Sequence, residues 1–143
     1  MATIVIVRDV MSKEVRVVRP DTTMKEVVAT MNKFSIGSII VVQGGRLVGI
    51  ITERDILTRQ VEPCLAPETL TARHVMTSPV VTINENASIE EAAQLMARKK
   101  AKRLPVMSDG KLVGIITYTD IVFKVPAMLS MLEELVRPYH RSN

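Results

Sequence analysis

The tetrapeptide Gly49-Ile50-Ile51-Thr52 returns unchanged as Gly114-Ile115-Ile116-Thr117, an offset of 65 positions (49 to 114). The same offset, held without a gap, also pairs Val10-Met11 with Val75-Met76, Glu26 with Glu91, Met31 with Met96, and Asp55-Ile56 with Asp120-Ile121. A single shared tetrapeptide carries little weight, but a constant offset over about fifty positions indicates an internal duplication. The chain therefore consists largely of two copies of one folding unit.

Each copy predicts a short strand followed by an amphipathic helix. The strands are expected at 15–18 and 80–83, which are rich in β-branched residues. In the helices, apolar residues recur at i, i+3, i+4 and i+7, the period of one buried face. These residues are Met24, Val27, Val28 and Met31 in the first copy and Ile89, Ala92, Ala93 and Met96 in the second. Both helices are expected to begin with a capping box, Thr23-x-x-Glu26 and Ser88-x-x-Glu91.

A hairpin is expected after each of these helices. Its strands are predicted at 39–42 and 47–51 around Gly44-Gly45, and at 104–107 and 112–116 around Asp109-Gly110. Both turn pairs tolerate the positive φ angles of tight hairpins. A second helix then starts at Thr52 or Thr117, which gives the order β-α-β-β-α twice. The predicted fold class is α/β (α+β in some schemes).

The domain organisation follows from the two copies. We expect repeat 1 at 8–60, a proline-containing connector at 61–71, repeat 2 at 72–125, and a C-terminal helix or tail at 126–143. A copy of about 50 residues buries little core alone, so the two are expected to pack together as one disc. The apolar residues of the tail predict a helix that either caps the core or packs on a partner subunit.

Composition excludes several classes of protein. Hydrophobic residues make up 47% of the 143 and charged residues 24%, which is typical of a globular chain. One cysteine, Cys64, excludes an internal disulfide and a multi-cysteine zinc site. No apolar run approaches the length of a membrane span. We therefore expect a soluble, cytoplasmic chain whose net charge of +4 suits phosphate-bearing partners.

The start of each second helix allows two interpretations. Thr52-x-x-Asp55 and Thr117-x-x-Asp120 have the spacing of a capping box, which is common at helix starts. The same groups also suit a nucleotide: helix N-terminal amides and a hydroxyl favour phosphate. An ionised aspartate one turn later accepts hydrogen bonds from a ribose diol. Because the motif is duplicated, both interpretations apply to each of the two helix starts.

These residues carry a resemblance to a known family. The Val-Met pairs, Ser38-Ile39-x-Val41 and Arg103-Leu104-x-Val106, and two copies of Gly-Ile-Ile-Thr-x-x-Asp-Ile resemble a tandem pair of cystathionine β-synthase (CBS) domains. The resemblance covers 8–60 and 72–125. It implies a Bateman module, a disc of the two repeats with a pseudo-two-fold axis and two clefts. Such clefts bind adenosine-containing ligands, among them AMP, ADP, ATP, S-adenosylmethionine and NAD-type molecules. AMP is the first expectation, as a regulatory ligand with no cofactor required.

The resemblance also implies site residues. Thr52 and Asp55 match the phosphate- and ribose-binding positions of a first cleft, and Thr117 and Asp120 those of a second. The residues expected to line the first cleft are Val15, Arg16, Ser38, Ile39, Ile50, Thr52, Arg54, Asp55, Lys102 and Arg103. Those expected to line the second cleft are Gly37, Ser38, Val80, Val81, Arg103, Pro105, Ile115, Thr117, Thr119 and Asp120.

Two departures from the family pattern favour the second cleft. Position 40 is Ile where the second copy has the usual proline, Pro105, and position 16 is an arginine, whose long side chain could crowd a base. The basic run 98–103 is explained in part by cations complementing a helix C-terminus. Its last two residues, Lys102 and Arg103, are equally consistent with a phosphate clamp.

Three classes of function remain open at this point. The first is a non-catalytic sensor of adenine nucleotides, expected by family resemblance to be a homodimer of discs. The second is an interaction module without a nucleotide, which docks on an unidentified target protein through the tail or disc face. The third, weak nucleic-acid binding through 98–103, is disfavoured because the chain has two Phe, two Tyr and no Trp for base stacking. No catalytic or metal-binding residues are assigned, because no nucleophile, base and orienting group occur together.

Overall fold

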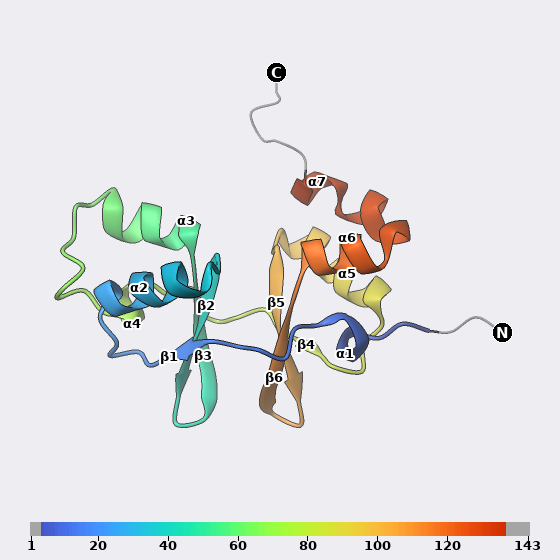
Figure 1. Ribbon diagram of the computed structural model, residues 1–143, viewed down its shortest axis with the longest axis horizontal. Coiled ribbons are helices and arrows are strands. Elements are labelled where there is room, and N and C mark those ends of the chain that lie inside the picture. Colours follow the sequence, from blue (N-terminus) through green and yellow to red (C-terminus); the bar gives the residue numbers. More distant parts are fainter. Residues whose placement is uncertain (1–3, 137–143) are drawn as a thin grey trace, which may run out of the picture. The chain divides into compact units, whose positions relative to one another are not determined.

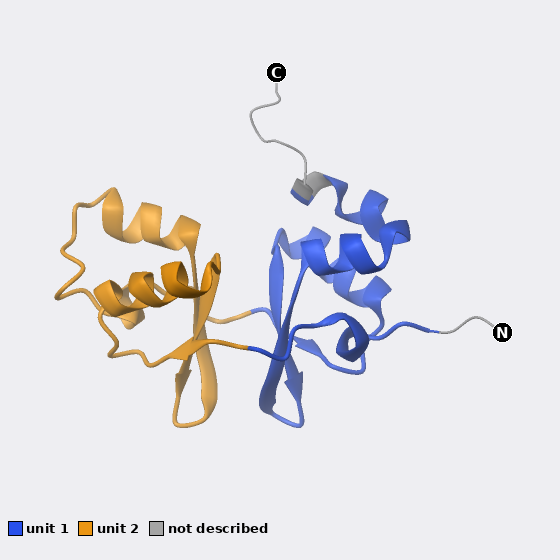
Figure 2. Cartoon of the chain, in the orientation of Figure 1, with its two compact units in different colours: residues 1–14, 81–143 blue, residues 15–80 orange. Residues whose placement is uncertain are grey.

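The computed structural model describes residues 4–136. The chain divides into two compact units, shown in separate colours in Figure 2: unit 1 combines Met1–Glu14 with Val81–Asn143, and unit 2 is Val15–Val80. Each unit contains one three-stranded sheet, β1-β2-β3 in unit 2 and β4-β5-β6 in unit 1. The predicted mixed fold class is therefore confirmed.

Unit 2 places its helices on one side of its sheet (Figure 1). Strand β1 pairs with β2 in parallel, and β2 pairs with β3 as an antiparallel hairpin. Helix α3 runs directly into the π-helical turn η1. The elements are β1 (Val17–Val18), α2 (Met24–Phe34), β2 (Ser38–Gln43), β3 (Arg46–Thr52), α3 (Glu53–Ile56), η1 (Leu57–Val61) and α4 (Ala72–Val75).

Unit 1 repeats this arrangement and adds a C-terminal segment. Strand β4 is parallel to β5, and β5 and β6 form an antiparallel hairpin. A 3-10 helix, η2, and a short helix, α7, follow α6. The elements are α1 (Val7–Val10), β4 (Ile83–Asn84), α5 (Ile89–Lys99), β5 (Arg103–Ser108), β6 (Lys111–Thr117), α6 (Tyr118–Lys124), η2 (Pro126–Leu132) and α7 (Glu133–Val136).

Most predicted elements lie where the sequence pattern put them. Ser88 and Glu91 form a complete capping box at the start of α5, whereas Thr23 accepts from the Glu26 amide without the reciprocal bond. The strand expected at 15–18 is shorter, because only Val17 and Val18 pair with a neighbour. The strand expected at 80–83 is displaced: β4 is Ile83–Asn84 and shares only Ile83 with the prediction, because residues 80–82 make no ladder pair.

Two short helices, α1 and α4, are absent from the predicted order. Each has only four residues, too few to show a helical period. Each is fixed by hydrogen bonds to residues outside the helix. The amide of Val7 donates to the Ala87 carbonyl at 2.8 Å, and the amide of Ala72 donates to the Thr22 carbonyl at 2.8 Å. Tertiary hydrogen bonds therefore fix these helices where local sequence does not.

These bonds also show that the two units exchange segments relative to the sequence copies. Helix α1 lies at the start of the first copy but packs with the second: Val7, Val10 and Met11 belong to the core of unit 1. Helix α4 lies at the start of the second copy, yet Ala72 and Val75 belong to the core of unit 2. Each core therefore depends on residues from both copies.

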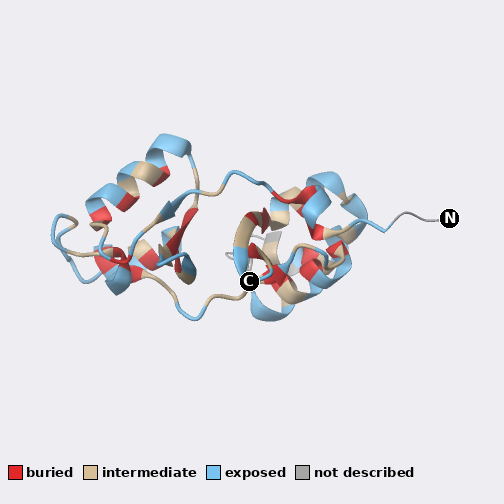
Figure 3. Cartoon of the chain, turned by 90° about the horizontal axis from the view of Figure 1, so that it is seen from below, coloured by how far each residue is buried: buried red, intermediate tan, exposed pale blue. Residues whose placement is uncertain are grey.

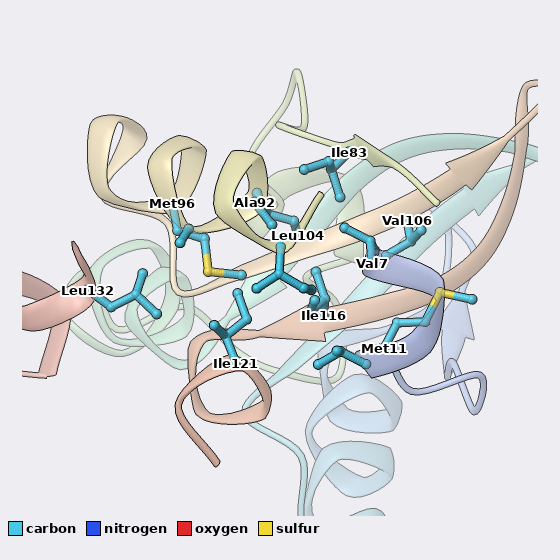
Figure 4. Packing of buried hydrophobic residues seen from close by; sticks show 13 residues of the cluster. Val7, Met11, Ile83, Ala92, Met96, Leu104, Val106, Ile116, Ile121 and Leu132 are labelled. Carbon is cyan, nitrogen blue, oxygen red and sulfur yellow. The ribbon is translucent and has the colours of Figure 1, made fainter. Parts of the chain in front are cut away.

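Each unit has one cluster of buried hydrophobic residues, contributed by both its sheet and its helices; Figure 3 shows the buried positions in red. In unit 2, Ile39, Val41 and Ile51 of the sheet contact the buried stripe of α2. In unit 1, Leu104 and Ile116 face Ala92, Met96 and the α6 residue Ile121 (Figure 4). Alternation along the strands sends every second side chain toward the helices.

The C-terminal segment closes the core of unit 1. Leu132 of η2 is fully buried beside Met96, as Figure 4 shows, and Met128, Met131 and Leu135 pack against the same cluster. Of the two predicted roles for the tail, the described part has the first: it covers a core. Residues 137–143 of the predicted tail lie outside the described residues. Within residues 4–136, no helix is both long and apolar enough to cross a bilayer.

Candidate functional site

The helix start in unit 2 is built by a complete capping box. The Asp55 carboxylate Oδ2 accepts from the Thr52 amide at 2.9 Å, and the Thr52 hydroxyl accepts from the Asp55 amide at 3.2 Å. The capping interpretation of this motif is therefore confirmed. Asp55 is 8% exposed, so its polar atoms depend on partners within the chain for hydrogen bonds.

Asp55 has a further partner from the exchanged segment. The Thr77 hydroxyl donates to Asp55 Oδ1 at 2.9 Å, and the Arg59 guanidinium lies 3.8 Å from the same oxygen. Thr77 is held there by a backbone bridge with Ile50, with N–O distances of 2.8 and 3.1 Å. Both carboxylate oxygens of Asp55 are thus engaged inside unit 2.

The loop before β2 lies beside this helix start. The Gly37 carbonyl accepts from the Glu53 amide at 3.2 Å, and Ser38 pairs with Thr52 across the hairpin. The structure therefore brings Gly37, Ser38, Thr52 and Asp55 together within unit 2. The predicted first cleft includes Ser38, Thr52 and Asp55, whereas Gly37 is predicted only for the second cleft.

The helix start in unit 1 has the same capping box, but its aspartate has fewer hydrogen-bond partners in the described part of the chain. Asp120 Oδ2 accepts from the Thr117 amide at 3.0 Å, and the Thr117 hydroxyl accepts from the Asp120 amide at 3.1 Å. Among residues 4–136, no group donates a hydrogen bond to Asp120 Oδ1. Ser12, which stands where unit 2 has Thr77, instead accepts from the Glu14 amide at 3.3 Å. Asp120 therefore keeps one oxygen available to a donor from outside.

The surroundings of Asp120 are also more basic. Lys102 precedes β5 and Arg103 is its first residue, whereas unit 2 has Gly37 and Ser38 at these positions. The Lys102 carbonyl accepts from the Tyr118 amide at 2.9 Å, and Arg103 pairs with Thr117 across the hairpin. The hydroxyls of Thr117 and Thr119 lie 2.9 Å apart on the first turn of α6. The backbone next to this helix start thus carries two basic residues, and the first turn of α6 carries two hydroxyls.

The other predicted residues lie in several environments. Ile39 is in the core of unit 2 and Ile50 is buried, while the exposed Arg16 stacks its guanidinium 3.7 Å from the centre of the Phe34 ring. In unit 1, Pro105 is buried and pairs with Ile115, which bridges to Ser12. Val15, Arg54 and Val80 belong to unit 2 and Val81 to unit 1, where it packs on the core.

Sequence reasoning missed the contribution of positions 12 and 77. The Val-Met pairs were recognised as part of the repeat, but the hydroxyl residue directly after each pair was not assigned a role. The signal was the shared offset, since Ser12 and Thr77 both follow Val-Met. Their hydroxyls make the two aspartates different.

Residues 4–136 contain no group of three or more His, Cys, Asp and Glu side chains placed to hold a metal ion. Cys64 is exposed and its thiol lies 3.8 Å from the Glu62 carbonyl.

Comparison with known proteins identifies the fold and the repeats. The model of the CBS domain family matches the chain twice, at residues 7–62 and 72–127. The CBS domain-containing protein YhcV of Bacillus subtilis is 36% identical over 80% of this chain and 81% of its own. An inosine-5'-monophosphate dehydrogenase of Methanocaldococcus jannaschii is 38% identical over 80% of this chain but only 22% of the enzyme, so the similarity is confined to one part of that protein.

The solved structures agree with this assignment. A hexameric CBS-CP12 protein from bloom-forming cyanobacteria superposes with a TM-score of 0.78 at 26% identity, over 96% of this chain and 78% of that one. The similarity therefore extends over the tandem arrangement and is not limited to a single repeat. With both repeats matched by the family model and both sheets observed, the chain belongs to the CBS domain family, whose modules are generally regulatory and ligand-binding.

Proposed function

We propose that the chain is a non-catalytic sensor that binds an adenosine phosphate, with AMP as the first candidate, at the Thr117–Asp120 helix start of unit 1. The observation that carries this proposal is the difference between the two aspartates. Both carboxylate oxygens of Asp55 accept hydrogen bonds, one from the Thr52 amide and one from the Thr77 hydroxyl. The Asp120 carboxylate accepts only from the Thr117 amide among the described residues. A ribose diol supplies the two donors that a carboxylate of this kind accepts.

The charges around Asp120 support a phosphate on the same ligand. Lys102 precedes β5 and Arg103 is its first residue, and the Lys102 carbonyl is bonded to the first residue of α6. Thr117 and Thr119 add hydroxyl donors one turn from the carboxylate. Charge-assisted contacts to phosphate are about twice as strong as neutral ones. One end of the site therefore suits ribose and the other suits phosphate.

The position of the site explains how binding would be transmitted. Ser12 bridges to Ile115 with N–O distances of 2.9 and 3.0 Å, only a few residues before the chain enters unit 2 at Val15. A ligand beside this bridge restrains the segment that connects the units. Such a ligand can shift the conformational equilibrium only by its difference in affinity for the two states.

A calorimetric and thermal-shift titration with AMP, ADP, ATP, NADH, S-adenosylmethionine and GTP tests the proposal. At a hundredfold excess over Kd, a bound ligand stabilises the chain by about 2.7 kcal/mol. This raises the melting temperature by about 5–10 °C for a chain of this size. Binding of an adenosine phosphate supports the sensor; no binding by any of the six at millimolar concentration contradicts it.

We further propose that the protein self-associates as a homodimer through apolar side chains outside both cores. Phe123 of α6 in unit 1 is 82% exposed, and Leu57 and Val61, the first and last residues of η1 in unit 2, are more than half exposed. Large apolar side chains exposed in this way are candidates for contacts with a second copy of the chain. Sedimentation velocity of wild type and Phe123→Glu tests this, and a monomeric wild type contradicts it.

A further inference from the structure

A pocket of about 350 Å³ opens on unit 2, at the hairpin end of its sheet. Strand β2 runs from Ser38, beside the Thr-Asp helix start, to Gln43 at the pocket. Five residues of extended chain span about 17 Å. The pocket is therefore separate from the Thr52–Asp55 site at the other end of the strand. It is lined by Arg19, Pro20, Asp21, Gln43, Gly44 and Arg73.

The lining has an excess of positive charge. Arg19 pairs with Asp21 at 3.2 Å, but both side chains are about three-quarters exposed, at 77% and 74%. Exposed pairs of this kind contribute little and are readily exchanged for another partner. The Arg73 side chain makes no hydrogen bond or ion pair with any residue between 4 and 136. Two guanidinium groups thus border the pocket against one carboxylate.

Unit 1 has an arginine in the equivalent place. The Arg8 amide donates to the Glu85 carbonyl at 2.9 Å, as the Arg73 amide donates to the Pro20 carbonyl at 3.0 Å. The Arg8 guanidinium lies 3.5 Å from the Glu85 carboxylate and donates to the Asn86 amide oxygen. In unit 1 the chain itself therefore supplies the acceptors for this arginine.

In unit 2 those acceptors have been replaced. Pro20 stands where unit 1 has Glu85, so the residue that accepts from the Arg73 amide has no carboxylate to offer the guanidinium. Asp21 stands where unit 1 has Asn86, and its carboxylate is directed to Arg19. The same backbone arrangement thus holds two different arginines. The Arg8 guanidinium of unit 1 has acceptors within the chain, whereas the Arg73 guanidinium of unit 2 has none among the described residues and borders a pocket.

We infer that this pocket binds the oxyanion group of a small molecule, a phosphate monoester or a carboxylate, between Arg19 and Arg73. An arginine fork binds either group through two parallel hydrogen bonds. The pocket volume lies at the lower end of the range of small-molecule sites, which is about 300–1,000 Å³. The ligand takes the place that the Glu85 carboxylate occupies beside Arg8 in unit 1.

Titration of the full chain with inorganic phosphate, and separately with acetate, tests the inference by ¹H–¹⁵N NMR. Saturable shifts are expected at the Gly44 and Arg73 amides, and the tighter ion shows which oxyanion the pocket prefers. Arg73→Gln should weaken binding about tenfold, since it removes one charge-assisted contact. Asp21→Asn, which introduces the unit 1 residue, should strengthen binding several-fold because Arg19 is released.

Arg8→Gln is the matched control. It removes the same charge at the equivalent position of unit 1, where Glu85 and Asn86 already hold the guanidinium, so the affinity at Gly44 and Arg73 should not change. The inference is overturned if neither ion gives saturable shifts at these amides at millimolar concentration. It is also overturned if Arg8→Gln weakens binding as much as Arg73→Gln, which indicates general charge attraction. Shifts at Thr117 and Asp120 report the nucleotide site separately.

Discussion

Met76 lies directly over Gly49: a Cβ atom on that glycine would be 2.4 Å from the Met76 Sδ and 2.8 Å from its Cγ. Met11 lies in the same way over Gly114, at 2.6 Å, where the Ser12 carbonyl oxygen is also only 2.7 Å away. The methionine of each Val-Met pair therefore packs on the glycine of the Gly-Ile-Ile-Thr motif in the other sequence copy. This contact explains why the two motifs recur together.

The two glycines should respond differently to alanine. Gly114→Ala forces a Cβ against a backbone carbonyl and should lower the free energy of unfolding by about 2–3 kcal/mol. The three atoms nearest to the Cβ of Gly49→Ala all belong to the Met76 side chain, whose Sδ and Cγ can move, so its loss should be smaller, about 1 kcal/mol. Urea denaturation of both variants provides the measurement.

A second substitution separates the two causes. Met76→Ala should remove most of the added penalty of Gly49→Ala, whereas Met11→Ala should leave that of Gly114→Ala largely in place because the Ser12 carbonyl remains. Equal rescue in both pairs would show that the backbone contact at Gly114 has no energetic effect.

The Thr77 hydroxyl should contribute to the stability of the fold. Thr77→Val removes its bond to the nearly buried Asp55 carboxylate and should lower the free energy of unfolding by about 1–2 kcal/mol. Ser12→Ala is the control, since Ser12 is exposed and does not contact Asp120; its effect should stay within about 0.5 kcal/mol. Similar losses in thermal or urea unfolding would contradict the difference between the two aspartates.

Leu132 should anchor the C-terminal segment. Its side chain is fully buried in the core of unit 1, so Leu132→Ala should destabilise the fold by about 2–4 kcal/mol. Leu129 is 45% exposed on the same 3-10 helix, and Leu129→Ala should change stability by less than about 1 kcal/mol. Differential scanning calorimetry compares them, and a small effect at Leu132 would argue against the segment closing the core.

Local pattern in the sequence predicts the elements well because each has a period or a cap of its own. The apolar stripe from Met24 to Met31 and the Gly44-Gly45 turn are examples, and both lie where expected. The exchange of α1 and α4 between the copies could not be predicted from local sequence pattern. An internal repeat shows which segments are similar in sequence. It does not show which of the two cores each segment packs against.

The candidate site was predictable to the same extent. The Thr-x-x-Asp spacing located both helix starts, since a capping box is local. The difference between Asp55 and Asp120 was not predictable, because it depends on Thr77, a residue 22 positions from Asp55 in sequence that a tertiary bridge brings into contact.

The most direct test of the sensor proposal is an AMP titration by calorimetry on wild type, Asp120→Asn and Asp55→Asn. Asparagine keeps an oxygen to accept from the amide at position 117, so the cap is retained while the charge that would hold a ribose is removed. Asp120→Asn should weaken AMP binding about thirtyfold, the loss of about 2 kcal/mol. Asp55→Asn, whose carboxylate is engaged internally, should leave AMP affinity unchanged. Binding that survives Asp120→Asn, or that is lost equally in both variants, would contradict the assignment of the site to unit 1.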